Sequence, residues 1–199
     1  MTRSRPQGCR SLSAPADSTR TVYRPPWRVD VVRRAGIRSP LPASELASMV
    51  VAALQAADAP EPGSVTVVLT GDDELSELNA EHMGADGTTD VLSFPMLPPE
   101  SFRRGASDVA PPKRKAWAPV GRARRTHIGD IAISIERAIE QSEAGRGGQT
   151  GDVRWSPADE LRLLVTHGTL HLCARDHAEP QDETAMRELE RRLLGRSRT

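Results

Sequence analysis

The sequence predicts an α+β fold, in which a small mixed β-sheet packs against helices and a metal-binding helix lies near the C-terminus. Segments with the apolar period of a helix and segments with the apolar run or alternation of a strand are mixed along the chain. The 199 residues suffice for one domain, and because only 3% are aromatic, its core must consist of Leu, Ile, Val and Ala.

Four segments are expected to form strands. Residues 65–69 are an apolar run with β-branched side chains, which is typical of a buried strand. Strict alternation places Ile131, Ile133 and Ile135 on one face of another strand. The expected strands span residues 27–32, 65–69, 90–94 and 127–135.

Five segments are expected to form helices. The clearest start lies at Ser156, which can cap the helix, because Pro157 suits the first helical position and Asp159 completes a variant of the capping box. The expected helices span residues 42–57, 72–82, 136–144, 157–173 and 181–194.

The chain is expected to consist of an N-terminal extension and one domain. Residues 1–26 are rich in Arg, Ser and Pro without an apolar period, which predicts a disordered basic extension. The domain is expected to span residues 27–195. It contains a basic inserted loop at about 97–126, and a structureless loop of that length is either functional or disordered.

The formal net charge of zero conceals a strong separation of charge. Residues 1–38 hold nine Arg and two acidic residues, and residues 99–126 hold eight basic and two acidic residues. The rest of the chain holds ten basic and 23 acidic residues. The two basic segments are candidate contacts for phosphate backbones. The alternative is an Arg-rich composition of disordered tails.

The sequence favours a cytoplasmic protein without a membrane partner. No stretch approaches the ~18 apolar residues of a membrane span, and no apolar segment of a secretory signal follows Met1. Cys9 and Cys173 lie far apart in different surroundings, which suits a reducing compartment. The alternative is an organelle, because an Arg- and Ser-rich start also resembles a transit peptide.

Three of the five histidines fall within eleven residues, as His167, His171 and His177. His167 and His171 are four residues apart on an expected helix, about 40° apart on one face, so both imidazoles can bind one metal ion. The spacing is that of the metzincin zinc proteases, and three protein ligands with one open position are typical of catalytic zinc. We therefore predict one Zn²⁺ per chain in a zincin-like arrangement, at a site that could also accept nickel, copper or iron.

The residues around this histidine triad limit which reactions a metal bound there could catalyse. Cys173 lies about 200° round the helix from His171 and is expected to be a small core residue. Gly168 stands where the zinc proteases have their general base Glu, so a peptidase is disfavoured. Metal-assisted hydrolysis remains, and a phosphodiester substrate would need cationic help with its charge. His82 and His127 fit no ligand spacing and are expected to be structural or exposed.

Longer blocks around the triad resemble one known family. HGTLHLCARDH resembles the HGxLHLxGYDH signature of the YbeY endoribonucleases, which are rRNA maturation factors. LNAEHMGADGTTDVLSFP (78–95) is similar to their LNxxYRGxDxPTDVLSFP, and IGDIAISIERAIEQSE (128–143) is similar to their LGDIVISxERAxEQAxE. The blocks follow one another in order within residues 27–194.

The resemblance implies a small α+β catalytic domain with one zinc on His167, His171 and His177. It implies cleavage of single-stranded RNA, chiefly in maturation of the 3′ end of 16S rRNA and in ribosome quality control. The implied partners are single-stranded RNA, the small ribosomal subunit and its assembly factors, and no DNA is expected.

The chain departs from the family pattern next to the site. Met83 stands where the family has an Arg implicated in RNA binding or catalysis, and Thr88 replaces a Pro. Ala174 and Arg175 replace a Gly-Tyr pair. If that Gly ends the helix in a left-handed conformation, Ala174 costs roughly 1 kcal/mol there.

Other cations are expected to give the phosphate contacts that Met83 does not. The candidates are Arg175 and the basic side chains of the inserted loop: Arg103, Arg104, Lys113, Arg114, Lys115, Arg122, Arg124 and Arg125. The alternative is a loop that is merely solvated. Met83 also leaves open a second function beside the zinc-dependent endoribonuclease, namely a metal-stabilised ribosome assembly factor with weak or no nuclease activity.

Overall fold

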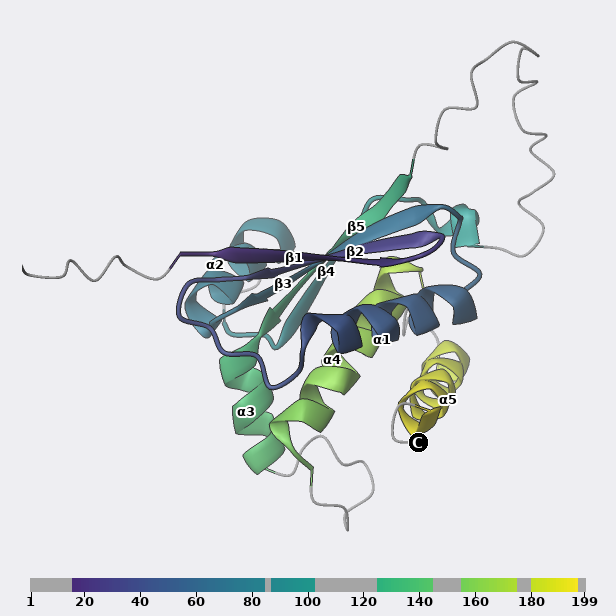
Figure 1. Cartoon of the computed structure of the whole chain (residues 1–199). Coiled ribbons are helices and arrows are strands. Elements are labelled where there is room, and N and C mark those ends of the chain that lie inside the picture. Colours follow the sequence, from purple (N-terminus) through teal and green to yellow (C-terminus); the bar gives the residue numbers. More distant parts are fainter. Residues whose placement is uncertain (1–15, 85–86, 103–124, 145–154, 175–179, 197–199) are drawn as a thin grey trace, which may run out of the picture.

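The protein contains one five-stranded mixed sheet in the order β1-β2-β3-β5-β4 (Figure 1). The computed structural model describes residues 16–84, 87–102, 125–144, 155–174 and 180–196. Strands β2, β3 and β5 are parallel, whereas β1 and β4 are antiparallel to their neighbours and form the two edges. The strands are β1 (Ser18–Arg24), β2 (Trp27–Arg33), β3 (Gly63–Thr70), β4 (Val91–Pro95) and β5 (Thr126–Ser134).

The helices lie mainly on one face of this sheet. α1 and α4 cover that face, α5 packs on α1 and α4, α3 continues from β5 and packs against α4, and α2 lies on the opposite face (Figure 1). The helices are α1 (Ala43–Ala56), α2 (Asp72–Met83), α3 (Ile135–Glu143), α4 (Pro157–Leu172) and α5 (Pro180–Arg196), with a 3-10 helix η1 (Pro99–Phe102). The predicted α+β fold, its four expected strands and its five expected helices are confirmed.

The core follows from the alternation of the strands. Val29 and Val65 and the expected pair Ile131 and Ile133 point into the main core between the sheet and α1, α4 and α5. A smaller cluster around Leu75 fills the space under α2. Each fully buried aliphatic side chain stabilises the fold by roughly 1.5–3 kcal/mol.

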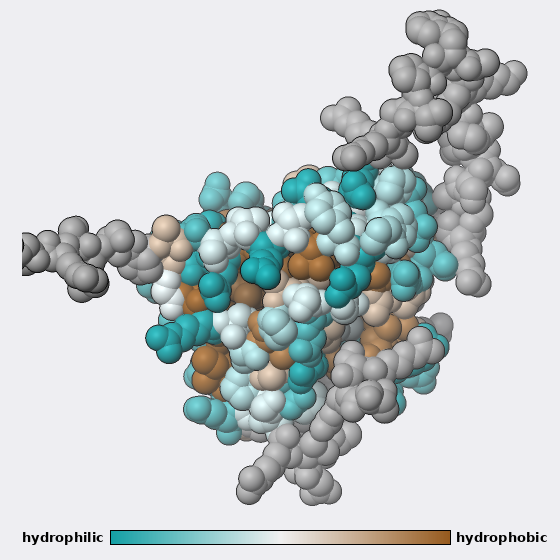
Figure 2. All heavy atoms as spheres, viewed as in Figure 1, coloured by the Kyte–Doolittle hydropathy of each residue, from teal (hydrophilic) through white to brown (hydrophobic). Residues whose placement is uncertain are grey.

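The visible surface is largely hydrophilic, with small groups of hydrophobic residues between the polar ones (Figure 2). No helix in the described ranges combines the length and the apolar character that a bilayer span requires.

The expectation of disorder throughout residues 1–26 is wrong from Ser18 onward, where β1 begins. β1 pairs with β2 along its whole length, from Ser18 opposite Arg33 to Arg24 opposite Trp27. Six of its seven side chains are exposed, and only Val22 packs against the core. Because backbone pairing rather than burial holds this strand, its sequence carries no apolar period. Residues 1–15 lie outside the described part of the chain.

The ends of the expected inserted loop are structured. Residues 99–102 form η1, whose Phe102 is buried in the main core, and β5 already begins at Thr126. Residues 103–124 lie outside the described residues.

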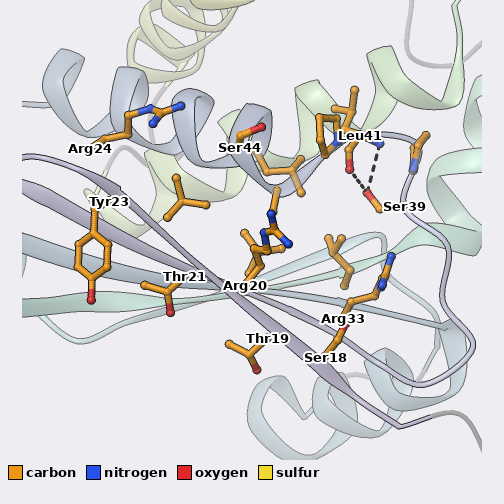
Figure 3. Close-up of a pocket in the computed structure, with 17 residues that line it drawn as sticks. Ser18, Thr19, Arg20, Thr21, Tyr23, Arg24, Arg33, Ser39, Leu41 and Ser44 are labelled. Atoms are coloured by element: carbon orange, nitrogen blue, oxygen red, sulfur yellow. Dashed lines mark hydrogen bonds between the residues drawn. The ribbon is translucent and has the colours of Figure 1, made fainter.

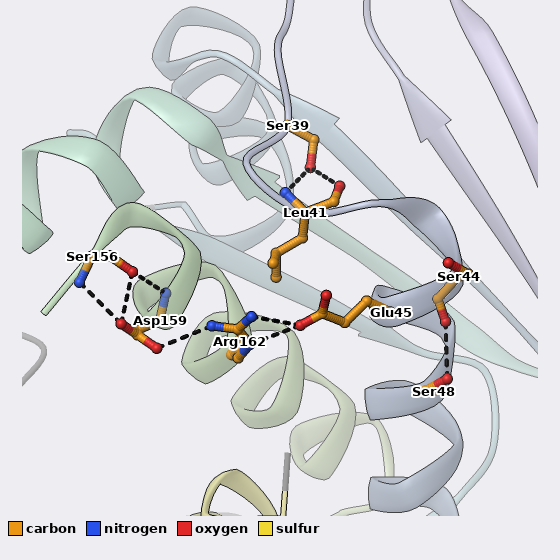
Figure 4. A network of polar contacts seen from close by, with 8 residues as sticks. All are labelled: Ser39, Leu41, Ser44, Glu45, Ser48, Ser156, Asp159 and Arg162. Carbon is orange, nitrogen blue, oxygen red and sulfur yellow. Dashed lines mark hydrogen bonds and ion pairs between the residues drawn. The ribbon is translucent and has the colours of Figure 1, made fainter. Parts of the chain in front are cut away.

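A polar network fixes the start of α4. Ser156 and Asp159 form the predicted capping box, each side chain bonding the other residue's backbone N–H. Arg162 donates to Asp159 (3.0 Å) on the same helix and to Glu45 of α1 (2.9 and 2.6 Å; Figure 4). The two helices are thereby joined by charge-assisted hydrogen bonds at their N-terminal turns.

The end of α4 is strained in the manner expected from the sequence. Ala174 directly follows the C-cap residue Cys173 and has φ = 55°, in the left-handed region. An alanine there costs roughly 1 kcal/mol relative to the glycine of the family pattern. Cys173 is buried in the main core, which confirms its predicted role as a small core residue.

Glu160, in the first turn of α4, is the basis of a prediction about stability. Burial raises the pKa of its carboxyl, the hydrogen bond from Trp155 Nε1 (2.6 Å) lowers it, and the charge of Asp90 raises it. The net shift of the pKa is upward, so the carboxyl ionises less readily in the folded protein than in the unfolded chain. As the pH rises above the pKa of the unfolded chain, ionisation of Glu160 therefore weakens the fold, whereas at low pH the protonated carboxyl has no such effect.

Glu160→Gln is therefore expected to raise the free energy of unfolding at pH 7 on the order of 1 kcal/mol, since Gln keeps the acceptor without the charge. Urea unfolding between pH 4 and pH 8 measures this, with Glu77→Gln on exposed α2 as the control of equal charge change. The gain should shrink towards pH 4. A gain that grows on acidification would contradict the account.

Candidate metal centre

Two imidazoles of α4 converge on one point. The Nε2 atoms of His167 and His171 lie 3.0 Å apart, and the two rings meet at 73° with centroids 4.5 Å apart. Two nitrogens on one tetrahedral zinc, at ~2.05 Å each, lie about 3.3 Å from one another. The pair is therefore arranged as two ligands of a single metal ion would be, as their helical spacing predicts.

Glu190 of α5 orients the first of these rings. Its Oε1 lies 2.7 Å from Nδ1 of His167, and the carboxylate side chain is only 9% exposed. With the Nδ1 proton donated to this carboxylate, Nε2 carries the lone pair that a metal needs. Sequence reasoning missed Glu190, because a partner 23 residues away leaves no trace in local spacing.

The predicted third ligand His177 lies outside the described residues, as does Arg175. Within the described ranges, no three His, Cys, Asp or Glu side chains form a group that could hold a metal. The described part of the predicted site is thus two of its three ligands, His167 and His171, with Glu190 beside the first.

The residue after the first histidine has no room for a side chain. A Cβ on Gly168 would lie 2.8 Å from Cγ2 of Ile131 and 3.1 Å from Cγ2 of Val91. The Oγ of Ser93 also donates to the Gly168 carbonyl at 3.0 Å. This position faces β4 and β5 rather than the imidazole pair. A protease-like Glu could not act from here, which gives the predicted absence of a peptidase base a steric reason.

The other singled-out side chains belong to other elements than α4. Met83 is the last residue of α2, which covers the opposite face of the sheet, and is 50% exposed. His82 packs its ring edge on Phe94 (5.2 Å between centroids). His127 contacts Asp130 (2.9 Å) and Ser64, so both histidines have the structural or exposed roles expected of them.

Of the predicted RNA-contacting loop residues, the structure describes Arg125. Its guanidinium lies over the ring of Tyr23, 5.7 Å from the centroid. The end of the inserted loop therefore contacts β1. The remaining candidates lie outside the described ranges: Arg103, Arg104, Lys113, Arg114, Lys115, Arg122 and Arg124.

Comparison with known proteins decides the family. The family model described as Endoribonuclease YbeY matches residues 38–198. The chain belongs to the YbeY endoribonuclease family. The YbeY endoribonuclease of Salinispora tropica is 40% identical over 131 residues, which cover 65% of this chain and 71% of the relative. That of Chloroflexus aurantiacus is 35% identical over 153 residues, covering 76% and 84%.

A further YbeY endoribonuclease, from Lachnoclostridium phytofermentans, is 31% identical over 151 residues, covering 74% of this chain and 83% of the relative. A Thermotoga maritima protein known from a solution structure is 21% identical with a TM-score of 0.46, covering 86% of this chain and 88% of the other.

The YbeY-like blocks contact one another beside α4. Arg137, in the block on β5 and α3, bonds the hydroxyl of Thr88, and Gln141 donates to Asp90 (2.9 Å) in the block that leads into β4. Arg137 also pairs with Asp72 (3.2 Å) at the start of α2. These contacts hold β4 beside β5, and α4 packs on these two strands at Gly168.

The packing of Gly168 can be tested by adding one methyl group. Gly168→Ala is expected to lower the free energy of unfolding by about 1–2 kcal/mol, because the steric conflict outweighs the gain in helix propensity. Gly195→Ala on α5, where nothing lies within 4 Å of the added Cβ, should instead leave stability unchanged or raise it by up to ~1 kcal/mol. Chemical denaturation measures both, and a Gly168→Ala protein as stable as the unmodified chain would refute this packing argument.

Proposed function

We propose that this protein is a zinc-dependent endoribonuclease that cleaves single-stranded RNA in the 3′-end maturation of 16S rRNA. Membership of the YbeY endoribonuclease family supports the reaction class. The observation that carries the metal dependence is the convergence of His167 and His171 Nε2 atoms at 3.0 Å. The proposal includes the small ribosomal subunit and its assembly factors as partners, and a cytoplasmic location.

In this proposal the imidazoles of His167 and His171 hold the metal through Nε2, and His177 is the third ligand by its spacing. Glu190 keeps the His167 ring in place and its Nδ1 protonated, because the buried carboxylate accepts that proton's hydrogen bond. The bound metal supplies Lewis-acid chemistry for phosphodiester hydrolysis. Gly168 offers no carboxylate, so the residue after the first histidine takes no part in proton transfer.

Met83 supports a second candidate function, a metal-stabilised ribosome assembly factor with weak or no nuclease activity. A thioether carries no charge, so position 83 cannot stabilise a phosphate as the Arg of the family pattern could. This candidate shares the metal site and differs only in catalysis.

Cleavage of a single-stranded 16S 3′-end RNA by the purified chain is expected to disappear with a chelator and to return with added zinc. His171→Ala should abolish cleavage, and Glu190→Gln should lower it by ~10–100-fold, as expected for the loss of a group that orients a ligand. Full activity in the presence of chelator would contradict the metal dependence.

A zinc-loaded chain that does not cleave this RNA would favour the assembly-factor function. In that case Met83→Arg is the informative variant. A rise in cleavage on restoring the arginine would place the defect at position 83.

A further inference from the structure

A groove of about 790 Å³ lies between β1 and the segment that leads into α1. Its walls come from residues 18–24 of β1 and residues 39–44, with Arg33 of β2 at one end (Figure 3). Its floor consists of the apolar residues Leu41, Leu46 and Leu69, each at most 6% exposed. The floor is thus already part of the core and offers little apolar surface to a ligand.

The charge of this groove is entirely positive. Arg20, Arg24 and Arg33 line it, all three are exposed, and no Asp or Glu is among its lining residues. None of the three forms an ion pair with a described residue. Nearby arginines differ in this respect, since Arg28 pairs with Asp30 (2.9 Å) and Arg34 pairs with Asp17 (2.9 Å).

The strand geometry directs these cations into the groove. Arg20 and Arg24 alternate with Val22, which packs against the main core, so they share its face of β1 and point towards α1 (Figure 3). Arg33 lies opposite Ser18 in the ladder of β1 and β2 and therefore shares this face. Hydroxyl groups of Ser18 and Ser44 add hydrogen-bond donors of the kind that contact phosphates.

The groove and the imidazole pair share no residue, since His167, His171 and Glu190 are all absent from the groove lining. β1 is one edge strand, whereas Gly168 of α4 packs on β4 and β5 at the other edge. The groove is therefore distinct from the candidate metal centre.

We propose that this groove binds the phosphate backbone of single-stranded RNA and so forms a second contact with the substrate of the proposed endoribonuclease. The proposal rests on the proposed function. The three arginines have no acidic partner among the described residues, so they give this edge of the sheet a positive potential that attracts phosphates. A peptide added to the edge of β1 would need apolar pockets for its side chains, and the buried floor does not provide them.

The test is the affinity of the full-length, zinc-loaded chain for a fluorescently labelled single-stranded 16S 3′-end RNA, measured by anisotropy over a salt series. The triple variant Arg20→Ser, Arg24→Ser, Arg33→Ser should bind at least tenfold more weakly at 0.1 M salt. Its log–log salt slope should be shallower by about 2, because each lost phosphate contact removes ~0.7 on a single strand. Gels run after each titration verify that the RNA is intact.

Two matched variants separate the groove from general charge effects. Arg187→Ser, Arg191→Ser, Arg192→Ser removes the same charge from the exposed side of α5 and should bind with nearly unchanged affinity. Replacing the three groove arginines by lysine should retain most of the affinity, since phosphate contacts require charge. Circular dichroism confirms that each variant is folded.

Unchanged affinity of the groove triple, or an equal loss in the α5 triple, would overturn the proposal. Unchanged affinity of the groove triple variant would instead favour a polypeptide as the partner that binds at the edge of β1. The experiment measures binding, so it can be judged separately from cleavage. If the unmodified chain does not cleave the RNA but the groove triple variant still binds it more weakly, only the proposed enzyme activity is refuted. An active chain with unchanged affinity refutes only the groove.

Discussion

The close packing of α4 on β4 and β5 is the constraint on which the candidate site depends. At Gly168 the helix approaches so closely that a Cβ would lie 2.8 Å from Ile131, and Ser93 binds the carbonyl of the same residue. Once this face of the helix is fixed, the imidazoles of His167 and His171 must project together from an adjacent face. The same glycine that allows the packing therefore removes the base of a protease and fixes the direction of the two imidazoles that are proposed to bind metal.

Helix α5 and the two ends of α4 complete this arrangement. Glu190 reaches the His167 ring from α5. Arg162 ties the start of α4 to α1, and Ala174 ends the helix in a left-handed conformation despite its Cβ. The roughly 1 kcal/mol of strain at Ala174 therefore lies three residues from His171, one of the predicted metal ligands.

Sequence reasoning predicted what local patterns encode. The alternation of Ile131 and Ile133 predicted a strand, and the capping residue Ser156 predicted the start of a helix. The spacing of four residues between His167 and His171 predicted that their imidazoles lie together. It missed β1, because exposed side chains leave no period, and Glu190, because its partner is distant in the chain. Sequence reasoning also could not show that the two basic segments meet. In the structure, Arg125 at the end of the second segment lies over Tyr23 of the first. Only the fold juxtaposes such residues.

The most direct test of the central claim is X-ray absorption spectroscopy at the zinc edge, combined with metal analysis of the full-length chain. The account predicts one zinc per chain with three imidazole nitrogens and no sulfur, because Cys173 is buried in the core. His171→Ala should lose one imidazole or the metal itself. A sulfur ligand, or an unchanged imidazole count in the variant, would contradict the account.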